Sequence, residues 1–261
     1  MFKHNRLVEI LSKSRLTGYK IDIIPTQLRP KTEEESYIVQ ESLHRYLFKK
    51  KYGKVIGYKI GCTTKVMQEY LGISNPCVGG VYDMNVSYIE GNYNFDKFIS
   101  PGVECEIAVY LDKDLLPSEY PHNKFSVEKS VSHAMASIEI VDDRWIDYKS
   151  VDTPSLIADD FFASGCVLGN KTKLDSIDLS EITGGMFIND QLVGSGCGKD
   201  IMGDPLEALV WIANFMSEKG KILKANQFVT LGSIVETKWL KPGDSVRIEI
   251  DRLGSAIANF I

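Results

Sequence analysis

The chain has 261 residues, enough for one large domain or for one domain with a helical appendage. Its 30 Lys and Arg against 35 Asp and Glu give a net charge of −5, and no basic cluster occurs, which argues against nucleic acid as a partner. No apolar run approaches the roughly 18 residues of a membrane helix, and the first residues lack the apolar core of a signal peptide. We therefore expect a cytoplasmic protein without a membrane partner.

The N-terminal third is predicted to be largely helical. Residues 33–50 have the apolar spacing of an amphipathic helix, which is supplied by Tyr37, Ile38, Leu43, Tyr46 and Leu47. Together with the preceding residues this predicts a small helical N-terminal part (1–54), followed by the main domain (55–261). That domain opens with a strand over 55–60 and a short helix over 64–71, which Gly72 closes.

From about residue 75 the pattern is mostly short strands and glycine-rich turns, with two helices. The first is predicted over 127–136 from the helical spacing of Val127, Val131, Ala134 and Met135, and it would carry His133. The second follows Asp204 as N-cap, with Pro205 at its first position, Glu207 completing a capping box and Gly220 at its end. The last residues predict a hairpin, with turns at 242–244 and 253–255. The pattern predicts an α+β, mainly β fold with peripheral helices.

The segment 103–111 carries the most informative pattern. Read as a strand, it places Glu104 and Glu106 on one face, roughly 6.6 Å apart along the backbone. In the strand-like run 137–141, Glu139 faces away from its apolar neighbours. Strands with carboxylates on a solvated face are common. Alternatively, three carboxylates on two strands could occupy three positions of an octahedral site, which water or substrate would complete.

These runs resemble the metal site of a known family. Residues 101–108 and 138–144 are similar to the fumarylacetoacetate hydrolase superfamily, and most of all to its 2-keto-4-pentenoate hydratase and 4-oxalocrotonate decarboxylase branch. Further matching segments occur in the family's order at 57–63, 157–160, 194–196, 203–206 and 253–255. The resemblance implies a mixed β-sandwich or β-roll that forms homo-oligomers. It also implies Mg²⁺ or Mn²⁺ bound by Glu104, Glu106 and Glu139.

The resemblance also selects candidate catalytic residues. Lys59 would by itself be a solvent-facing strand lysine, but the family match places it in the active site, where it would bind a carboxylate or move a proton. Asp83 resembles an active-site acid of the hydratases, although an Asp near glycines is usually a turn residue. Asp160 stands where the family usually has Asn; an ionised Asp only accepts hydrogen bonds, so specificity would differ if this position touches substrate.

Two further patterns bear on ligand binding. The run 194–198 fails the spacing of a phosphate loop, so we interpret it as a glycine-rich turn near a ligand, with Ser195 and Gly196 as substrate-binding candidates. The five cysteines are odd in number and widely spaced, which fits reduced thiols better than a disulfide framework or a zinc site. None of the four histidines can be placed in the His–Glu dyad of the family's hydrolases.

The leading hypothesis is a divalent-metal hydratase that adds water to a 2-hydroxypenta-2,4-dienoate-like acid to give a 4-hydroxy-2-oxo acid. Three alternatives remain open: decarboxylation of a 2-oxo diacid of the 4-oxalocrotonate type, hydrolytic C–C cleavage of an acylpyruvate, and binding of a 2-oxo acid without turnover. The first of these would use the same stabilisation of enolate charge.

Overall fold

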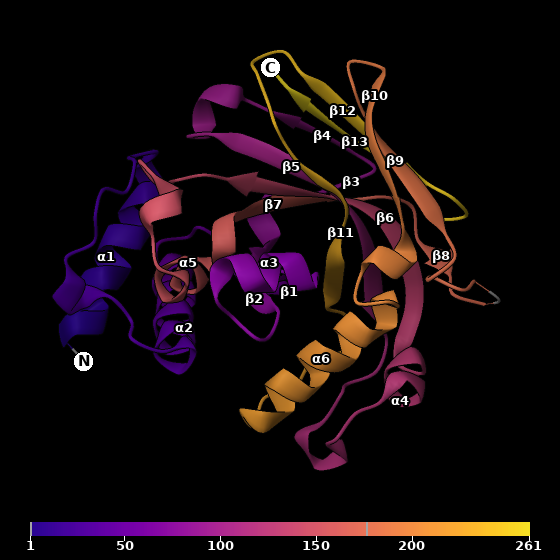
Figure 1. Ribbon diagram of the computed structural model, residues 1–261, viewed down its shortest axis with the longest axis horizontal. Helices are drawn as coiled ribbons and strands as arrows, with labels where there is room; N and C mark the ends of the chain where they lie inside the picture. Colours follow the sequence, from indigo (N-terminus) through magenta and orange to yellow (C-terminus); the bar gives the residue numbers. More distant parts are fainter. Residues whose placement is uncertain (1, 176) are drawn as a thin grey trace.

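The computed structural model describes residues 2–175 and 177–261 as a sheet-dominated α+β fold (Figure 1). Its α-helices are α1 (Phe2–Thr17), α2 (Glu33–Lys49), α3 (Lys65–Leu71), α4 (Lys124–Glu128), α5 (Thr153–Ala158) and α6 (Pro205–Glu218). The strands are β1 (Val55–Gly61), β2 (Cys77–Tyr82), β3 (Val86–Tyr88), β4 (Glu90–Tyr93), β5 (Pro101–Leu111), β6 (Val131–Asp142), β7 (Ala163–Leu168), β8 (Thr172–Lys173), β9 (Thr183–Ile188), β10 (Gln191–Cys197), β11 (Phe228–Trp239), β12 (Ser245–Ile250) and β13 (Gly254–Phe260).

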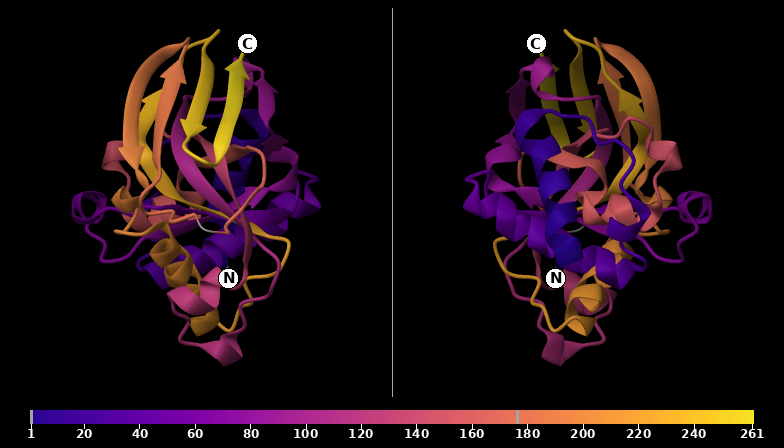
Figure 2. Two further views of the ribbon diagram at one scale, coloured as in Figure 1. Left: turned by 90° about the vertical axis from the view of Figure 1, so that its right-hand side faces the viewer. Right: turned by 90° about the vertical axis from the view of Figure 1, so that its left-hand side faces the viewer.

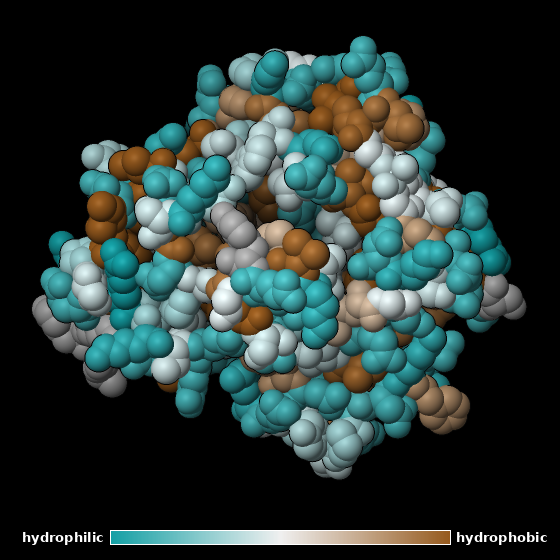
Figure 3. All heavy atoms as spheres, in the orientation of Figure 1, coloured by the Kyte–Doolittle hydropathy of each residue, from teal (hydrophilic) through white to brown (hydrophobic). Residues whose placement is uncertain are grey.

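The strands form one mixed sheet in the order β10-β9-β12-β13-β4-β3-β7-β6-β5-β11-β1-β2, and β8 pairs with β6. The sheet is curled, because β10 packs against β11 and β2 packs against β7, although these strands are far apart in the order. Helices gather in the half of the molecule away from β9, β10, β12 and β13 (Figure 2). The face shown in Figure 3 is largely hydrophilic, with apolar side chains in scattered groups.

The register of the central strands places the predicted carboxylates. In the antiparallel pair β5–β6, Glu104 lies opposite Glu139. On its other edge β5 pairs with β11, and β11 pairs in parallel with β1, so that Lys59 lies beside Thr230. Strand β11 therefore separates the carboxylate strand β5 from the lysine strand β1.

The N-terminal helices pack into the same continuous core as the sheet. Leu7 and Leu11 of α1 and Leu43 and Leu47 of α2 are fully buried there. Thr32 caps α2 by accepting the Glu35 N–H, in accord with the predicted start of this helix, but Ile38 is 46% exposed rather than part of the buried side. Among the described residues no helix has the length and apolar character needed to cross a membrane.

Of the three helices predicted after residue 60, two are confirmed, whereas α5 was not predicted. Helix α3 lies between its caps Thr64 and Gly72, the latter with φ +65°. Helix α6 begins at Pro205 as predicted. However, the Asp204 carboxylate accepts the Leu206 N–H, and the Glu207 N–H donates to the Asp204 carbonyl instead, so the expected capping-box bond is replaced by a backbone bond.

The prediction of a helix over 127–136 was wrong. Helix α4 ends at Glu128, and Val131 already begins β6, which therefore carries His133. From Ala134 onwards every residue of β6 is buried, and apart from Glu139 and Asp142 both faces of this strand carry apolar or small side chains. A strand buried on both faces loses the alternation that would identify it, and its apolar residues then also satisfy a helical spacing.

Candidate metal centre and active site

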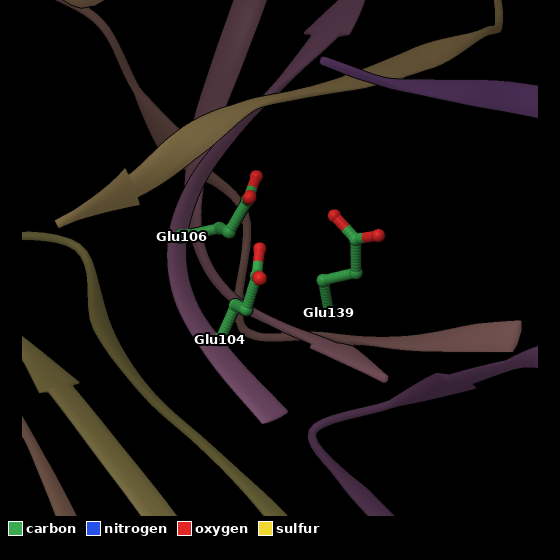
Figure 4. A group of neighbouring side chains, drawn as sticks. All are labelled: Glu104, Glu106 and Glu139. Atoms are coloured by element: carbon green, nitrogen blue, oxygen red, sulfur yellow. The ribbon is translucent and has the colours of Figure 1, made fainter. Parts of the chain in front are cut away.

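Three glutamates converge between the central strands. Glu104 and Glu106 project from one face of β5, and Glu139 projects from the adjacent β6 towards the same space (Figure 4). One carboxylate oxygen of each lies within 4.8 Å of the others. Glu106 and Glu139 are each 1% exposed, whereas Glu104 is half-buried. The structure thus brings together the carboxylates that the strand periodicity selected.

The hydrogen bonds of this cluster leave oxygens free. The Thr237 hydroxyl donates to Glu104 Oε1 over 2.5 Å, and the Gly232 N–H donates to Glu106 Oε2 over 3.1 Å. Among the described residues, Glu106 Oε1 and Glu139 Oε2 are buried without a hydrogen-bond partner. Buried polar atoms without partners are costly, so these oxygens are positioned for a ligand.

One cation faces the cluster within the protein. Lys59 Nζ lies 3.1 Å from Glu139 Oε1, and both side chains are nearly inaccessible to solvent. Three carboxylates against one ammonium leave an excess of negative charge in a buried site, which a divalent cation would balance. The donor set consists of oxygen atoms alone, which suits Mg²⁺ or Mn²⁺ and lacks the soft ligands that zinc favours.

The electrostatics of the cluster raise the pKa of two of its carboxyls, Glu106 and Glu139, when no cation is bound. Burial raises the pKa of Glu106 well above its usual range, and the charges of Glu139 and Glu104 raise it further. Burial also raises the pKa of Glu139 to about 7, although Lys59 opposes this shift. Burial alone would lower the pKa of Lys59, but the charges of Glu139 and Glu104 outweigh it and raise that pKa. Lys59 is therefore held as a cation.

A cavity of about 440 Å³ opens beside the cluster. Its lining includes Lys59 and Glu104 and three aromatic side chains, Phe161, Phe162 and Tyr148, which we call the aromatic wall. The remaining lining comes from β1, α3 with its preceding loop, β6, β11 and Asp200. Among the described lining residues Lys59 is the sole cation, whereas Glu104, Asp200 and Glu236 are acidic. The described lining thus offers one cation, Lys59, that can bind an anion, and much of the remaining lining is apolar.

Asp160 lies behind this wall rather than in it. Its fully buried carboxylate accepts the Gly80 N–H (2.9 Å) and the Tyr82 hydroxyl (3.2 Å), and it contacts His44 Nε2 at 2.6 Å. Burial would raise the pKa of Asp160, but His44 and Arg15 oppose this and hold it at about 2. The carboxylate is thus ionised and occupied by protein partners, so the condition under which Asp160 would alter specificity, a contact between this side chain and the substrate, is not met in this arrangement.

The other three candidates do not reach the cavity. Asp83 follows β2 and accepts the Lys54 N–H, about 13 Å along the strand from the glycine beside Lys59. Ser195 and Gly196 line a separate open depression formed by β9, β10, β12 and β13. Gly196 packs against the Ile234 carbonyl of β11, so it supports the cavity wall from behind. Asp200, a few residues further on, lines both this depression and the cavity beside the glutamates.

Sequence reasoning missed several residues of the site. Thr237 and the Gly232 N–H hold the metal-site carboxylates, but they lie on a strand that is more than 120 residues away along the chain. Phe161 and Phe162 line the cavity, and a local signal for them existed, because two large aromatics directly follow the family motif at 157–160. His44 meets Asp160 across 116 residues, without a local signal.

Comparisons with known proteins agree with this geometry. The chain is 31% identical to 2-keto-4-pentenoate hydratase 1 of Dechloromonas aromatica over 96% of this chain and 94% of that protein. It is 26% identical to 4-oxalocrotonate decarboxylase of Pseudomonas putida over 98% and 96% of the two chains.

A solved structure, 4-oxalocrotonate decarboxylase from Pseudomonas putida G7 complexed with magnesium and adipate, superposes with a TM-score of 0.92 at 25% identity and covers 99% of this chain and 97% of that one. The family model for the fumarylacetoacetate (FAA) hydrolase C-terminal region matches residues 95–261. The resemblance inferred from the sequence is confirmed: the chain belongs to the fumarylacetoacetate hydrolase family.

Proposed function

We propose that the protein is a Mg²⁺- or Mn²⁺-dependent lyase that adds water to a 2-hydroxypenta-2,4-dienoate-like acid to form a 4-hydroxy-2-oxo acid. The observation that carries the proposal is the cluster of three glutamates beside a single buried lysine, at one end of a largely apolar cavity. The similarity to a 2-keto-4-pentenoate hydratase over nearly the whole of both chains supports the same reaction.

Each polar residue has a defined task in this proposal. Glu104, Glu106 and Glu139 would hold the metal ion, which when bound polarises the C2 oxygen of the substrate and stabilises enolate charge. Thr237 and the Gly232 N–H orient two of the carboxylates by hydrogen bonds. Lys59 binds the C1 carboxylate of the substrate or holds a proton at Nζ for transfer to it.

The apolar residues set the environment of the reaction. Phe161, Phe162 and Tyr148 line the cavity and would pack against the carbon chain of a bound dienoate. In such a low-dielectric site the charge of Lys59 acts more strongly on a substrate anion than it would in water. The acidic side chains Asp200 and Glu236 are the remaining titratable carboxyl groups on the lining outside the metal cluster.

The second candidate is decarboxylation of a 2-oxo diacid, favoured by the high TM-score to a 4-oxalocrotonate decarboxylase. Such a substrate has a second carboxylate at its far end, which needs a cation or hydrogen-bond donors there. In the described part of the lining, Lys59 is the sole cation and already faces the glutamate cluster, so a second carboxylate would depend on neutral donors such as the Thr63 and Thr64 hydroxyls. This charge pattern favours a monocarboxylate and therefore the hydratase.

The two remaining alternatives have less support. C–C hydrolysis would need a water-activating dyad, but the His44–Asp160 pair lies outside the cavity lining. Loss of catalysis is disfavoured because the carboxylate cluster and its lysine are complete. For the whole protein we propose a cytoplasmic homo-oligomer with a helical N-terminal part (1–54) and a catalytic domain (55–261), whose curled sheet forms the mixed β-sandwich or β-roll expected from the family.

A substrate panel tests the proposal. Dienoate monoacids, 2-oxo diacids of the oxalocrotonate type and acylpyruvates would be assayed with Mg²⁺, with Mn²⁺ and with EDTA. We expect the highest kcat/KM for the monoacid dienoates, loss of turnover in EDTA and recovery on metal addition. The variant Lys59→Met is assayed on the same panel. Its control is Lys54→Met, which removes an exposed lysine just before β1, the strand that carries Lys59. A preference for diacids would contradict the hydratase assignment, and turnover unaffected by EDTA would contradict the metal site.

A further inference from the structure

The aromatic wall of the cavity rests on an unusual stretch of backbone. Asp160, Phe161 and Phe162 have φ values of +54°, +49° and +67°, so three consecutive non-glycine residues adopt the left-handed conformation. This region is unfavourable for residues with a Cβ atom, and most of all for bulky ones. Such a conformation persists only where the surrounding structure holds it. We call residues 159–163 the arch.

Two buried arginines hold both ends of the arch. At its start, the Asp159 carbonyl accepts hydrogen bonds from Arg15 Nη2 (2.6 Å) and Arg144 Nη2 (3.1 Å). At its end, the Ala163 carbonyl accepts from Arg15 Nη1 (2.9 Å) and Arg144 Nη1 (3.4 Å). Each guanidinium therefore spans the arch, which its fork of donors permits and a lysine ammonium could not reproduce.

Charge fixes the two arginines in place. The Asp159 carboxylate lies between them, with Oδ1 3.1 Å from Arg15 Nε and Oδ2 3.0 Å from Arg144 Nε. Arg15 also approaches Asp160 Oδ2 at 3.4 Å. All four side chains are at most 2% exposed, and their formal charges cancel. Removing one partner of such a buried ion pair would leave an uncompensated charge, so the carboxylates and guanidinium groups hold one another in place.

The arch sets the position of groups that face the substrate. Phe161 and Phe162 line the cavity, and the Phe161 ring centroid lies 5.3 Å from Lys59 Nζ. The Asp160 carbonyl lies against Gly79, where an added Cβ would be 2.6 Å from that oxygen and 3.2 Å from Lys59 Cε. The backbone of the arch thus packs against Gly79, and Gly79 packs against Lys59.

We propose that Arg15 and Arg144 are positioning residues for the reaction: together they clamp the arch and so fix the aromatic wall over Lys59. The kinetic part of this inference rests on the proposed function, whereas the clamp itself does not. Arg15 belongs to α1, far outside the segment matched by the family model, so the N-terminal helix contributes to the shape of the catalytic cavity.

A double-mutant cycle separates positioning from general stability. Arg144→Lys keeps the charge but not the fork, and Arg6→Met removes an exposed arginine from α1 as a control. We expect kcat/KM on the best substrate to fall about 10- to 100-fold in Arg144→Lys and to stay unchanged in Arg6→Met. In the background of Phe161→Ala the same lysine substitution should cost less than about threefold, because the ring that the clamp holds over Lys59 is already removed. Equal losses in both backgrounds would overturn the proposal.

A second measurement needs no substrate, so it stays informative if the proposed function fails. Chymotrypsin cuts after aromatic residues, and Phe161 is 8% exposed in the clamped arch. We expect limited digestion of Arg144→Lys to begin after Phe161 or Phe162, with the wild type and Arg6→Met uncut there. First cleavage elsewhere, or no faster cleavage, would overturn the clamp. If Arg144→Lys does not fold, Arg15→Lys provides the same test from α1.

Discussion

Metal binding by the three-glutamate cluster should release protons, and the amount should depend steeply on pH. The ligand carboxyls must be ionised to bind a hard cation, but burial holds the pKa of Glu139 at about 7 and that of Glu106 well above its usual range. From Glu139 alone, roughly nine-tenths of a proton would be released on binding at pH 6, and roughly one-tenth at pH 8. The apparent Mg²⁺ affinity should therefore be about tenfold weaker at pH 6 than at pH 8 from this group, and weaker still because of Glu106.

The same shifts determine how the metal-free protein responds to pH. Because the folded state raises the Glu139 pKa above its unfolded value of 4.5, it binds more protons than the unfolded state between about pH 4.5 and 7. The stability of the metal-free protein should fall as pH rises through this window. Added Mg²⁺ should accordingly raise Tm more at pH 8 than at pH 5.

Titration calorimetry in two buffers of different ionisation enthalpy, at pH 6, 7 and 8, measures both affinity and proton release. Glu236→Gln is the matched control, since this carboxylate lines the same cavity but is 88% exposed and stands outside the cluster. Its proton release should equal that of the wild type. Proton release that does not change between pH 6 and pH 8 would refute the reasoning.

Further predictions concern the ligand set, the lysine, the packing and the assembly. Glu106→Gln should weaken Mg²⁺ binding by about 2–4 kcal/mol in calorimetry, because one ligand charge is lost in a buried site; equal affinity would remove Glu106 from the ligand set. Lys59→Met should keep Mg²⁺ binding but lose about 2–4 kcal/mol of transition-state stabilisation in kcat/KM; partial rescue by Arg would indicate carboxylate binding, and no rescue would indicate proton transfer. Gly79→Ala should destabilise the protein by about 1–3 kcal/mol in denaturant titration, since the new Cβ would meet the Asp160 carbonyl at 2.6 Å; an unchanged midpoint would contradict the packing. Light scattering should give a mass of at least twice the 29.3 kDa of one chain, and a monomer would contradict the proposed assembly.

The carboxylate cluster was predictable because strand periodicity is a local property. Alternation in 103–111 places Glu104 and Glu106 on one face, and the apolar neighbours of Glu139 give its face as well. The strand register that sets Glu104 opposite Glu139 cannot be predicted from either segment alone. Family resemblance supplied that link, as it did for Lys59. The helix predicted over 127–136 failed for the complementary reason, because a strand buried on both faces has no alternation to detect.

The rest of the site depends on contacts between distant parts of the chain. Arg15 meets Asp159 across 144 residues, and each residue alone reads as an ordinary charged side chain. Asp160 matches a family motif by position, yet its carboxylate is turned to His44 and Tyr82 and away from the cavity, which a motif cannot reveal. The sequence motifs likewise do not reveal that Asp83, Ser195 and Gly196 lie away from the cavity. The curl of the sheet determines which strand ends meet there.

The position of β11 between β5 and β1 determines when the site can form during synthesis. The carboxylates and the lysine are all present once residue 139 has emerged, but the strand that lies between β5 and β1 and supplies Thr237 and the Gly232 N–H spans Phe228–Trp239. Until that strand is inserted, the hairpin of β5 and β6 has one open edge, and Lys59 has no register relative to it. Strands that are far apart in the sequence lose much conformational entropy when they pair, and this loss precedes the stabilising contacts. We therefore expect β11 to pair late in folding. A nascent chain can therefore pair the glutamates on β5 and β6 well before β11 adds Thr237, the Gly232 N–H and the register of Lys59, so completion of the site is a late event in folding.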